Sequence, residues 1–463
     1  MEPVLLIDIG STFTKVCSLD MYSGTILGTA QSGTTVEDDV CIGIENATKI
    51  LEDKTHINNY KKKLACSSAA GGLAVMVSGL VESLTLKAAK LAAMGAGAKI
   101  IRGFHHQLTS GDIKYIIDTD FDIFILAGGT DGGNDQIIIE NAHKLAGISK
   151  KFPVVIAGNR TAAEECGEIL AASGKAIHIC PNILPRVDEL NIRPVNEIIR
   201  KLFTEQITKA KGISKAEKLV DGILMPTPFA VLSAVTILSE GVGSESGLGE
   251  IMGIDVGGAT TDVHSVCEGY NLSGDTIFEG FAEPYIKRTV EGDLGVRYNA
   301  GSIVDAVSDK PLNPFRDREA LFMELEAIKR NPWLLFGKDD PSIDDELCSA
   351  AVRVASARHC GTVERRYTSN GIRYIQRGKD LSQIKAVIGT GGVLVNSPKA
   401  AGILSEAAYN GKEPDSLRPK NPEIYIDKKY ILPAMGLLST IDPGMALKVM
   451  KKEIIKIQRG SSL

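Results

Sequence analysis

The sequence predicts an α/β protein whose two halves begin in the same way. Residues 5–16 read LLIDIGSTFTKV, and residues 252–263 read MGIDVGGATTDV. Each segment is an apolar strand that ends in Asp, followed by a glycine turn, small hydroxyl residues and a second strand. Between about residues 120 and 185, strands alternate with helices, which is typical of parallel β-α-β units. A chain of 463 residues is too long for one hydrophobic core, so we expect two or three domains.

Composition argues against several classes of protein. The net charge of −5 gives no general attraction to nucleic acid or to an anionic membrane. The eight cysteines contain no C-x-x-C pair, so we expect reduced thiols in a cytoplasmic protein. The start, MEPVLLID, lacks the basic region of a signal peptide. Residues 64–81 carry no charge but are rich in Ala, Gly and Ser, which predicts a buried helix rather than a membrane span.

The remaining elements follow from local pattern. A β-meander occupies about the first 35 residues, and residues 73–98 form an Ala- and Leu-rich helical run. Further helices are expected at 191–209 and 228–240. Residues 241–250 hold four glycines and predict a hinge, after which the meander starts again. The last predictions are helices over 299–366, a strand, glycine turn and helix start over 386–395, and helices from 433 that break near Pro443.

The repeated hairpin suits a polyphosphate and Mg²⁺. Asp8 and Asp255 present carboxylates where Mg²⁺ takes oxygen ligands through its water shell. Glycines leave no Cβ to hold a phosphate away from backbone amides, and hydroxyls add donors. The candidate phosphate contacts are Gly10, Ser11, Thr12, Gly257, Gly258, Thr260 and Thr261. One D-x-G turn alone has an ordinary structural explanation, whereas two in corresponding positions are more specific.

A third glycine element, GTGG at 389–392, follows an apolar strand. Its glycines, Gly389, Gly391 and Gly392, offer a flat loop over which adenosine could pass, although a plain strand-to-helix turn explains them too. A Walker A loop is absent, and no G-x-G-x-x-G opens a strand–helix unit with a following acidic residue. The pattern therefore disfavours a P-loop or a dinucleotide fold.

Taken in order, D-x-G-[ST], D-x-G-G-x-T-x-D and G-T-G-G resemble the actin, sugar-kinase and heat-shock-chaperone ATPase superfamily. The resemblance implies an actin-like two-domain fold of duplicated ribonuclease-H-like domains that binds ATP and Mg²⁺. It places Lys15 on the β- and γ-phosphates, and it makes 226–241 and 433–446 the two connecting helices. Met225 stands where the chaperones have an acidic residue, so the water-positioning group is Asp262 or another residue. Capping of a turn is the alternative role for Asp262.

A narrower resemblance covers essentially the whole chain. The segments LAGGTDGGNDQ, IAGNRTAAEEC, MPTPFAVL, DVGGATTDVHSV and VEGDLGVRYNA are together similar to the glutamate mutase accessory proteins, a family called MutL or GlmL. The implied role is an ATP-dependent reactivating chaperone whose partner is adenosylcobalamin-dependent glutamate mutase (methylaspartate mutase). The expected parts are domain I at 1–240 with an α/β insert at 120–185, domain II at 241–432, and C-terminal helices at 433–463 that return to domain I.

Alternatives stay open at this level. A small-molecule kinase on the same scaffold would need an acceptor pocket with a catalytic carboxylate, for which Asp131 and Asp135 are candidates. A non-catalytic ATP-binding scaffold, homo-oligomeric or not, is the other. The TDGGNDQ run at 130–136 suits either a ligand or partner site or an Asx turn capped by Asn134 or Asp135.

Three smaller features complete the sequence predictions. Asn159, Arg160 and Thr161 follow a strand of the same α/β insert and are expected at the same crevice as the TDGGNDQ run. The loop holding Glu291, Asp293 and Arg297 either closes over the phosphates or is solvated. Adjacent histidines, 105 and 106, point apart on a helix and predict no metal site.

Overall fold

The computed structural model describes most of the chain: residues 1–10, 12–34, 40–68, 73–207, 219–270, 276–307, 317–331, 342–369 and 371–458. Ser11 lies outside the described residues. Two compact units make up the chain: unit 1 holds residues 1–70, 207–276 and 288–463, and unit 2 holds residues 71–206 and 277–287. None of the described helices is both long and apolar enough to cross a membrane.

A five-stranded sheet forms the first half of unit 1, in the order β10-β4-β1-β2-β3. β1 pairs antiparallel with β2 and parallel with β4, and β4 pairs parallel with β10. The elements are β1 (Pro3–Ile9), β2 (Phe13–Asp20), β3 (Thr25–Gly33), α1 (Val40–Thr55), β4 (Lys62–Ser67) and β10 (Ile223–Pro226). β1 is buried from Val4 to Ile9, so it is the centre of this sheet.

The second half of unit 1 repeats the arrangement with the order β16-β14-β13-β19-β20-β21. β13 pairs antiparallel with β14 and parallel with β19. The strands are β11 (Gly241–Val242), β12 (Glu245–Ser246), β13 (Ile251–Val256), β14 (Thr261–Val266), β16 (Ile286–Glu291), β17 (Thr362–Thr368), β18 (Gly371–Arg377), β19 (Ala386–Thr390), β20 (Glu423–Ile426) and β21 (Ile455–Ile457). The helices are α9 (Ala300–Ala306), α10 (Arg318–Arg330), α11 (Ile343–His359), α12 (Gly392–Asn396) and α13 (Ala400–Ser405).

The two sheets share one topology. In each, the first two strands pair antiparallel, a further strand lies beside the second one, and two later strands add in parallel on the other side of the first strand. This is the ribonuclease-H-like arrangement, and its duplication makes unit 1 an actin-like α/β fold. The fold predicted from the repeated hairpin is therefore confirmed.

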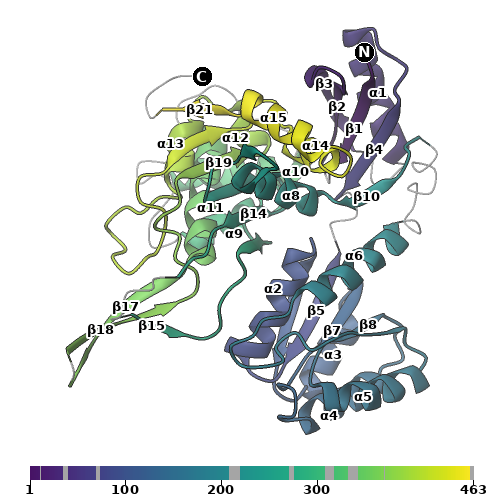
Figure 1. The fold of residues 1–463 in the computed structure, drawn as a ribbon, viewed down its shortest axis with the longest axis vertical. Helices are drawn as coiled ribbons and strands as arrows, with labels where there is room; N and C mark the ends of the chain where they lie inside the picture. The colour runs from purple at the N-terminus through teal and green to yellow at the C-terminus, as the bar shows by residue number, and fades with distance from the viewer. Residues whose placement is uncertain are drawn as a thin grey trace. The chain divides into compact units, whose positions relative to one another are not determined.

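Two helices join the halves of unit 1 and pack against each other, α8 (Thr227–Glu240) and α14 (Leu432–Leu438) (Figure 1). They approach closely at Gly436, where an added Cβ would lie 1.9 Å from the carbonyl oxygen of Ala230. α14 also packs on β1 and β4, and α15 (Pro443–Glu453) follows it. The predicted connecting segments at 226–241 and 433–446 are thus helices in contact.

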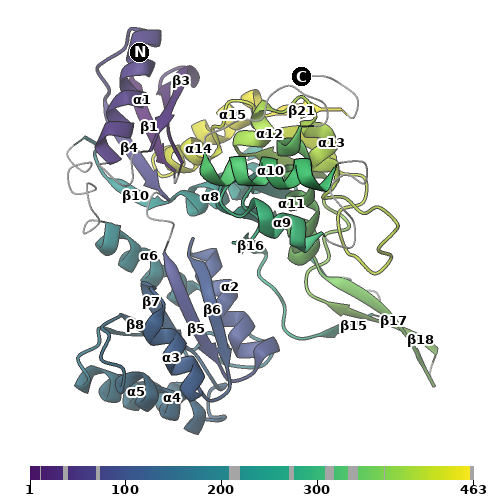
Figure 2. The ribbon, with the colours of Figure 1, turned by 180° about the vertical axis from the view of Figure 1, so that it is seen from behind.

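Unit 2 is a doubly wound sheet with the order β6-β5-β7-β8-β9, in which every pairing is parallel. α3, α4 and α5 cover one face around an apolar core, while α2 packs on β5 and β6 (Figure 2). Its elements are β5 (Ala74–Gly79), the π-helix η1 (Glu82–Leu86), α2 (Lys87–Gly95), β6 (Lys99–His105), α3 (Ser110–Asp118), β7 (Ile123–Leu126), α4 (Gln136–Ala146), β8 (Val154–Ile156), α5 (Arg160–Ala172), β9 (Ile177–Ile179) and α6 (Arg193–Ile207). β15 (Thr276–Glu279) opens its second segment. The α/β alternation predicted at 120–185 is confirmed and lies inside this unit.

Several secondary-structure predictions are wrong. Residues 362–366 belong to strand β17 rather than to a helix, and His105 ends strand β6, so the two histidines do not lie on a helix. Residues 64–81 contain the ends of β4 and all of β5 rather than a buried helix, and the run at 73–98 is helical only from Glu82. A strand covered on both faces loses its alternation, so its apolar run cannot be told from a buried helix by periodicity. Residues 455–457 form strand β21, paired with β20, instead of continuing the predicted C-terminal helices.

Candidate functional site

The two D-x-G hairpins have the same turn. The amide of Gly10 donates to the carbonyl of Phe13 at 3.1 Å, and the amide of Gly257 donates to the carbonyl of Thr260 at 2.9 Å. A Cβ on Gly10 would lie 2.6 Å from that carbonyl oxygen, so the turn requires glycine. Each turn fixes an Asp at the end of the first strand, opposite Lys15 in one hairpin and Asp262 in the other.

Both hairpins line one cavity of about 220 Å³ in unit 1. The predicted site residues that line it are Asp8, Gly10, Thr12, Lys15, Asp255, Gly257, Gly258, Thr260, Asp262 and Gly392. Thr261, Gly389 and Gly391 are not among its lining residues. Thr261 is fully buried and donates its hydroxyl to the carbonyl of Leu294, so the structure uses that hydroxyl inside the protein.

Asp8 is buried and held from several sides. Its Oδ1 accepts a hydrogen bond from the Thr227 hydroxyl at 2.6 Å and a weak one from Cys66 Sγ at 3.7 Å. Its Oδ2 lies 3.6 Å from Lys15 Nζ and accepts no hydrogen bond from the described residues. The first residue of α8 therefore aims the Asp8 carboxylate and leaves one oxygen available.

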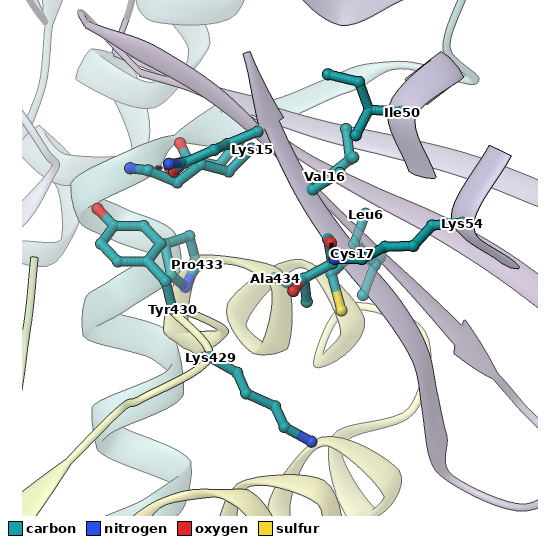
Figure 3. A pocket seen from close by; sticks show the side chains of 14 residues that line it. Leu6, Lys15, Val16, Cys17, Ile50, Lys54, Lys429, Tyr430, Pro433 and Ala434 are labelled. Atoms are coloured by element: carbon teal, nitrogen blue, oxygen red, sulfur yellow. Dashed lines mark hydrogen bonds and ion pairs between the residues drawn. The ribbon is translucent and has the colours of Figure 1, made fainter. Parts of the chain in front are cut away.

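Lys15 forms part of the wall between this cavity and a second one. Its ammonium lies 3.6 Å from the centre of the Tyr430 ring, a cation–π contact, and both residues line both cavities (Figure 3). The second cavity, of about 290 Å³, lies beside β2 and β3 and is mostly apolar. Burial raises the pKa of its Cys17 thiol to about 12, and the Asp427 carboxylate adds to this, so Cys17 stays a neutral thiol.

Asp255 has the most perturbed carboxyl group of the site. Burial, and after it the Asp262 carboxylate, raise its pKa from 3.8 to about 7, while Lys15 opposes the shift. Its Oδ1 is buried and accepts no hydrogen bond from the described residues. A buried carboxylate without donors is costly, so this atom is suited to an ionic ligand from outside the protein.

Both carboxylate oxygens of Asp262 accept hydrogen bonds. Its Oδ1 accepts from Arg288 Nε at 2.9 Å and from Arg288 Nη2 at 2.5 Å, and its Oδ2 accepts from the Thr260 hydroxyl at 2.9 Å. Beside it on β14, His264 also lines the cavity, and neither ring nitrogen has a hydrogen-bond partner among the described residues. Burial and the Arg288 charge lower the pKa of His264 to about 3, so its imidazole is neutral.

This donor set fits a hydrated divalent cation shared with phosphate oxygens. Mg²⁺ is usually held by one or two carboxylates together with water and substrate phosphates. Asp8 and Asp255 each offer a buried oxygen without a hydrogen-bond donor, one from each half of unit 1. Among the described residues, no group of three or more His, Cys, Asp or Glu side chains could hold a metal ion by itself. The residues present therefore suit an ion that arrives with a phosphate ligand.

The GTGG loop touches the second hairpin. Gly391 has φ of 109°, and a Cβ there would lie 2.3 Å from the carbonyl oxygen of Val256. Only glycine permits both the left-handed backbone and this approach. A Cβ on Gly392 would meet nothing within 4 Å, which leaves open space on the cavity side, whereas one on Gly389 would meet Leu404. Gly389 is therefore needed for packing, and Gly392 borders the cavity.

Other predicted loops have structural partners. Glu291 and Asp293 both pair with Arg358 of α11, and Arg297 forms a two-bond pair with Asp344 while its backbone binds the carbonyl of Gly258. The Arg297 side chain lines the cavity but its guanidinium faces this partner.

In unit 2, the TDGGNDQ loop is held by its own polar side chains. Asp131 accepts from the Arg160 amide and from Asn182, and Asn134 accepts from the amide of Ile137. Asn159 caps α5 and bonds the backbone of the loop. The α4 N-cap residue, Asp135, makes no side-chain capping bond. These contacts match the predicted Asx turn, and a ligand role for the loop stays a prediction.

Sequence reasoning missed four residues of the site: Thr227, His264, Arg288 and Tyr430. Thr227 could have been found, because it lies in the PTPF segment and is the first residue of the connecting helix. His264 lies on β14 two residues after Asp262, and a lone histidine there gives no signal of its own. Arg288 and Tyr430 reach the cavity or its carboxylates from positions distant along the chain, and no local pattern marks them. Burial and the specific partners identify them only once the fold is known.

Replacing Thr227 with valine tests how Asp8 is held. The change keeps the shape and removes the donor 2.6 Å from Asp8 Oδ1. Loss of a buried donor to a carboxylate should lower the free energy of unfolding by about 1–3 kcal/mol. Thr227→Ser retains the hydroxyl and should lose clearly less. Chemical denaturation of the three proteins measures this, and equal losses in both variants would contradict the assignment.

Comparison with known proteins places the chain in a family. The family model described as "MutL protein" matches residues 4–454. The curated relative Protein MutL of Clostridium tetanomorphum is 42% identical over 467 residues, which is 99% of this chain and 100% of the relative.

Matches among solved structures are distant. A ligand-bound xylulose kinase from Lactobacillus acidophilus is 10% identical, with 99% of this chain and 93% of that chain covered and a TM-score of 0.36. The ethanolamine utilization protein EutJ from Carboxydothermus hydrogenoformans is also 10% identical, with 96% and 90% covered and a TM-score of 0.25. The family model and the curated relative each span nearly the whole chain, and the chain therefore belongs to the MutL protein family.

Proposed function

We propose that this protein binds and slowly hydrolyses Mg·ATP, and that it uses the resulting movement to reactivate an adenosylcobalamin-dependent glutamate mutase. The observation that carries the ATP part is the cavity in which two equivalent D-x-G hairpins, from two halves of one duplicated fold, bring Asp8 and Asp255 together. The partner rests on family membership, because the resemblance of the sequence is to glutamate mutase accessory proteins.

Each hairpin contributes groups that suit a polyphosphate. Asp8 and Asp255 would hold the hydrated Mg²⁺, which neutralises phosphate charge when bound. Lys15 supplies a positive charge beside Asp8, and Thr12 has a buried hydroxyl without a hydrogen-bond partner among the described residues. The two glycine turns line the same cavity without a Cβ in the way of a ligand, and Gly392 leaves room for the nucleoside.

Water activation falls to the groups around Asp262. Both oxygens of Asp262 already accept hydrogen bonds, so it positions neighbouring groups rather than taking a proton. His264 is neutral and its ring nitrogens have no described partner, so it can accept a hydrogen bond from a water molecule in the cavity. Phosphoryl transfer needs mainly positioning and charge stabilisation, and a slow ATPase requires no stronger base.

Hydrolysis can be converted into movement because the two phosphate hairpins belong to different halves of unit 1. A bound polyphosphate attracts groups from both halves, and loss of the terminal phosphate weakens that attraction. A change of this kind could separate an inactive cofactor from a mutase. A kinase on the same scaffold would use the same hairpins, so the experiment must distinguish the two.

The test is phosphate release from Mg·ATP by the pure protein, with and without glutamate mutase inactivated by bound hydroxocobalamin. Release that the mutase stimulates, with recovery of mutase activity, is the expected result. Release that ignores the mutase would overturn the reactivation role and lead to a search for a kinase acceptor. Absence of release under both conditions would overturn the ATPase. Asp255→Ala is the control that should release nothing while remaining folded.

A further inference from the structure

The chain takes an unusual path between β14 and β16. Residues 277–287 belong to unit 2, and the chain is back in unit 1 from residue 288. Unit 2 is thus joined to unit 1 not only where it is inserted after β4 but also through this short segment. The second half of the segment holds two buried charged residues, Glu283 and Lys287.

In unit 2 the segment is anchored by Glu283. Its side chain is 3% exposed, and it pairs with Lys87 Nζ at 2.6 Å and with Lys287 Nζ at 2.6 Å. Lys87 begins α2 and also lies 5.4 Å from the ring centre of the buried Phe281. Burial would raise the pKa of Glu283, but the two ammonium groups outweigh it and leave the pKa below its ordinary value.

Such an anchor resists displacement. Removing one partner of a buried ion pair leaves an uncompensated charge, which is strongly destabilising. Glu283 and Lys287 are buried together, at 5% exposure each, so the segment cannot leave unit 2 without exposing both. A shift of β16 therefore moves the anchored segment rather than detaching it.

The other end of the segment reaches the cavity. Arg288 directly follows Lys287 and is 3% exposed, and it donates two hydrogen bonds to Asp262, which lines the cavity. Asp262 is bonded in turn to Thr260 at the turn of the second hairpin. Six consecutive residues, 283–288, thus connect a cavity carboxylate to an ion-pair anchor on α2.

We propose that residues 283–288 transmit the nucleotide state of the cavity to unit 2. A displacement of Asp262 would move Arg288 through their hydrogen bonds, and Glu283 would transfer that movement to α2 through its ion pair with Lys87. The inference rests on the proposed function, since it takes a Mg nucleotide as the ligand of the cavity. On this proposal, unit 2 is the part of the molecule that responds to ATP bound in the cavity. Arg288 is a positioning residue here, because it acts through Asp262.

Hydrogen–deuterium exchange of the full chain, with and without a non-hydrolysable Mg·ATP analogue, tests this connection. In the wild-type protein the analogue should slow exchange in both hairpins and also change it in residues 281–288 and in α2. Glu283→Gln should keep the response of the hairpins and lose the response in α2. Glu168→Gln is the matched control, an exposed glutamate on α5 of the same unit, and should behave as wild type.

Each outcome decides a different claim. Protection of the hairpins without any change in α2, or a full α2 response in Glu283→Gln, would overturn the connection while leaving the ATP site intact. Absence of protection in the wild-type hairpins would overturn the proposed function as well. If Glu283→Gln disorders unit 2 even without the analogue, Lys87→Gln removes the other partner of the same ion pair from a half-exposed position: hairpin protection with no α2 response supports the connection, and a preserved α2 response contradicts it.

Discussion

Replacing Asp255 with asparagine is expected to make the folded protein more stable at pH 8 and to abolish turnover of Mg·ATP. Burial and the Asp262 carboxylate raise the pKa of Asp255 to about 7 in the folded protein, against 3.8 for an ordinary Asp. Ionising it in the fold therefore costs stability. At about 1.4 kcal/mol per pKa unit, the asparagine variant gains up to about 4 kcal/mol where Asp255 is charged.

The direction of the pKa shift of Asp255 determines how the stability of the protein depends on pH. Because the folded pKa is raised, the favourable contribution of protonated Asp255 is fully present below pH 3.8 and is lost as the pH rises through about 7. The variant and the wild type should thus differ most at pH 8 and converge towards pH 4. Denaturant unfolding at both pH values checks this. Asp188→Asn, at an 85% exposed side chain, is the control and should show no such difference.

Turnover of Mg·ATP by Asp255→Asn should fall, although the stability of the variant rises. Asparagine is neutral and a poor Mg²⁺ ligand, so phosphate release should fall by about two orders of magnitude or more, as expected when a charge-stabilising group is lost. A more stable but inactive protein is the signature of a residue retained for function at the expense of stability. An active variant, or one less stable at pH 8, would contradict the assignment of Asp255.

Gly436→Ala should destabilise the protein severely although alanine is the better helix former. Gly436 lies inside α14, where propensity alone would favour alanine by about 1 kcal/mol. Its Cβ, however, would lie 1.9 Å from the carbonyl oxygen of Ala230 on α8, a backbone atom that cannot turn away. The connecting helices must separate, and the expected loss is about 3 kcal/mol or more.

The matched control for this change is Gly402→Ala. Gly402 lies in α13, and a Cβ there would meet nothing within 4 Å, so propensity should act alone and stabilise by about 0.5–1 kcal/mol. Thermal and denaturant unfolding of both variants measure the difference. Equal effects at the two positions would mean that α8 and α14 do not touch as described.

Much of unit 1 was predictable because its signals are local. The repeated hairpin pairs an apolar strand ending in Asp with a glycine turn, and both copies appear with the same turn hydrogen bond. The start of unit 2 was not predictable in the same way. β5 is a parallel strand buried on both faces, and Gly79 at its end lies where a Cβ would be 2.4 Å from the Leu86 amide nitrogen. The periodicity of apolar residues gives no information about such close packing of a strand against a helix.

In the candidate site, too, residues in local motifs could be predicted, and residues that depend on distant partners could not. Asp8, Lys15 and Asp255 could be proposed from motif spacing, whereas Arg288 and Tyr430 act through partners far away in sequence. Arg288 is positioned by the return of the chain from unit 2, and Tyr430 by the segment before α14. Their roles depend on buried charge and ring contacts that the residue order alone does not encode. The domain boundaries drawn from the sequence stay a prediction.

Calorimetric titration with a non-hydrolysable Mg·ATP analogue, of the wild type and of Asp255→Asn, tests most directly whether the two hairpins form a nucleotide site. We predict saturable binding to the wild type that requires Mg²⁺ and is lost or greatly weakened in the folded variant. Failure of the wild type to bind, or binding of equal strength by both proteins, would contradict the account.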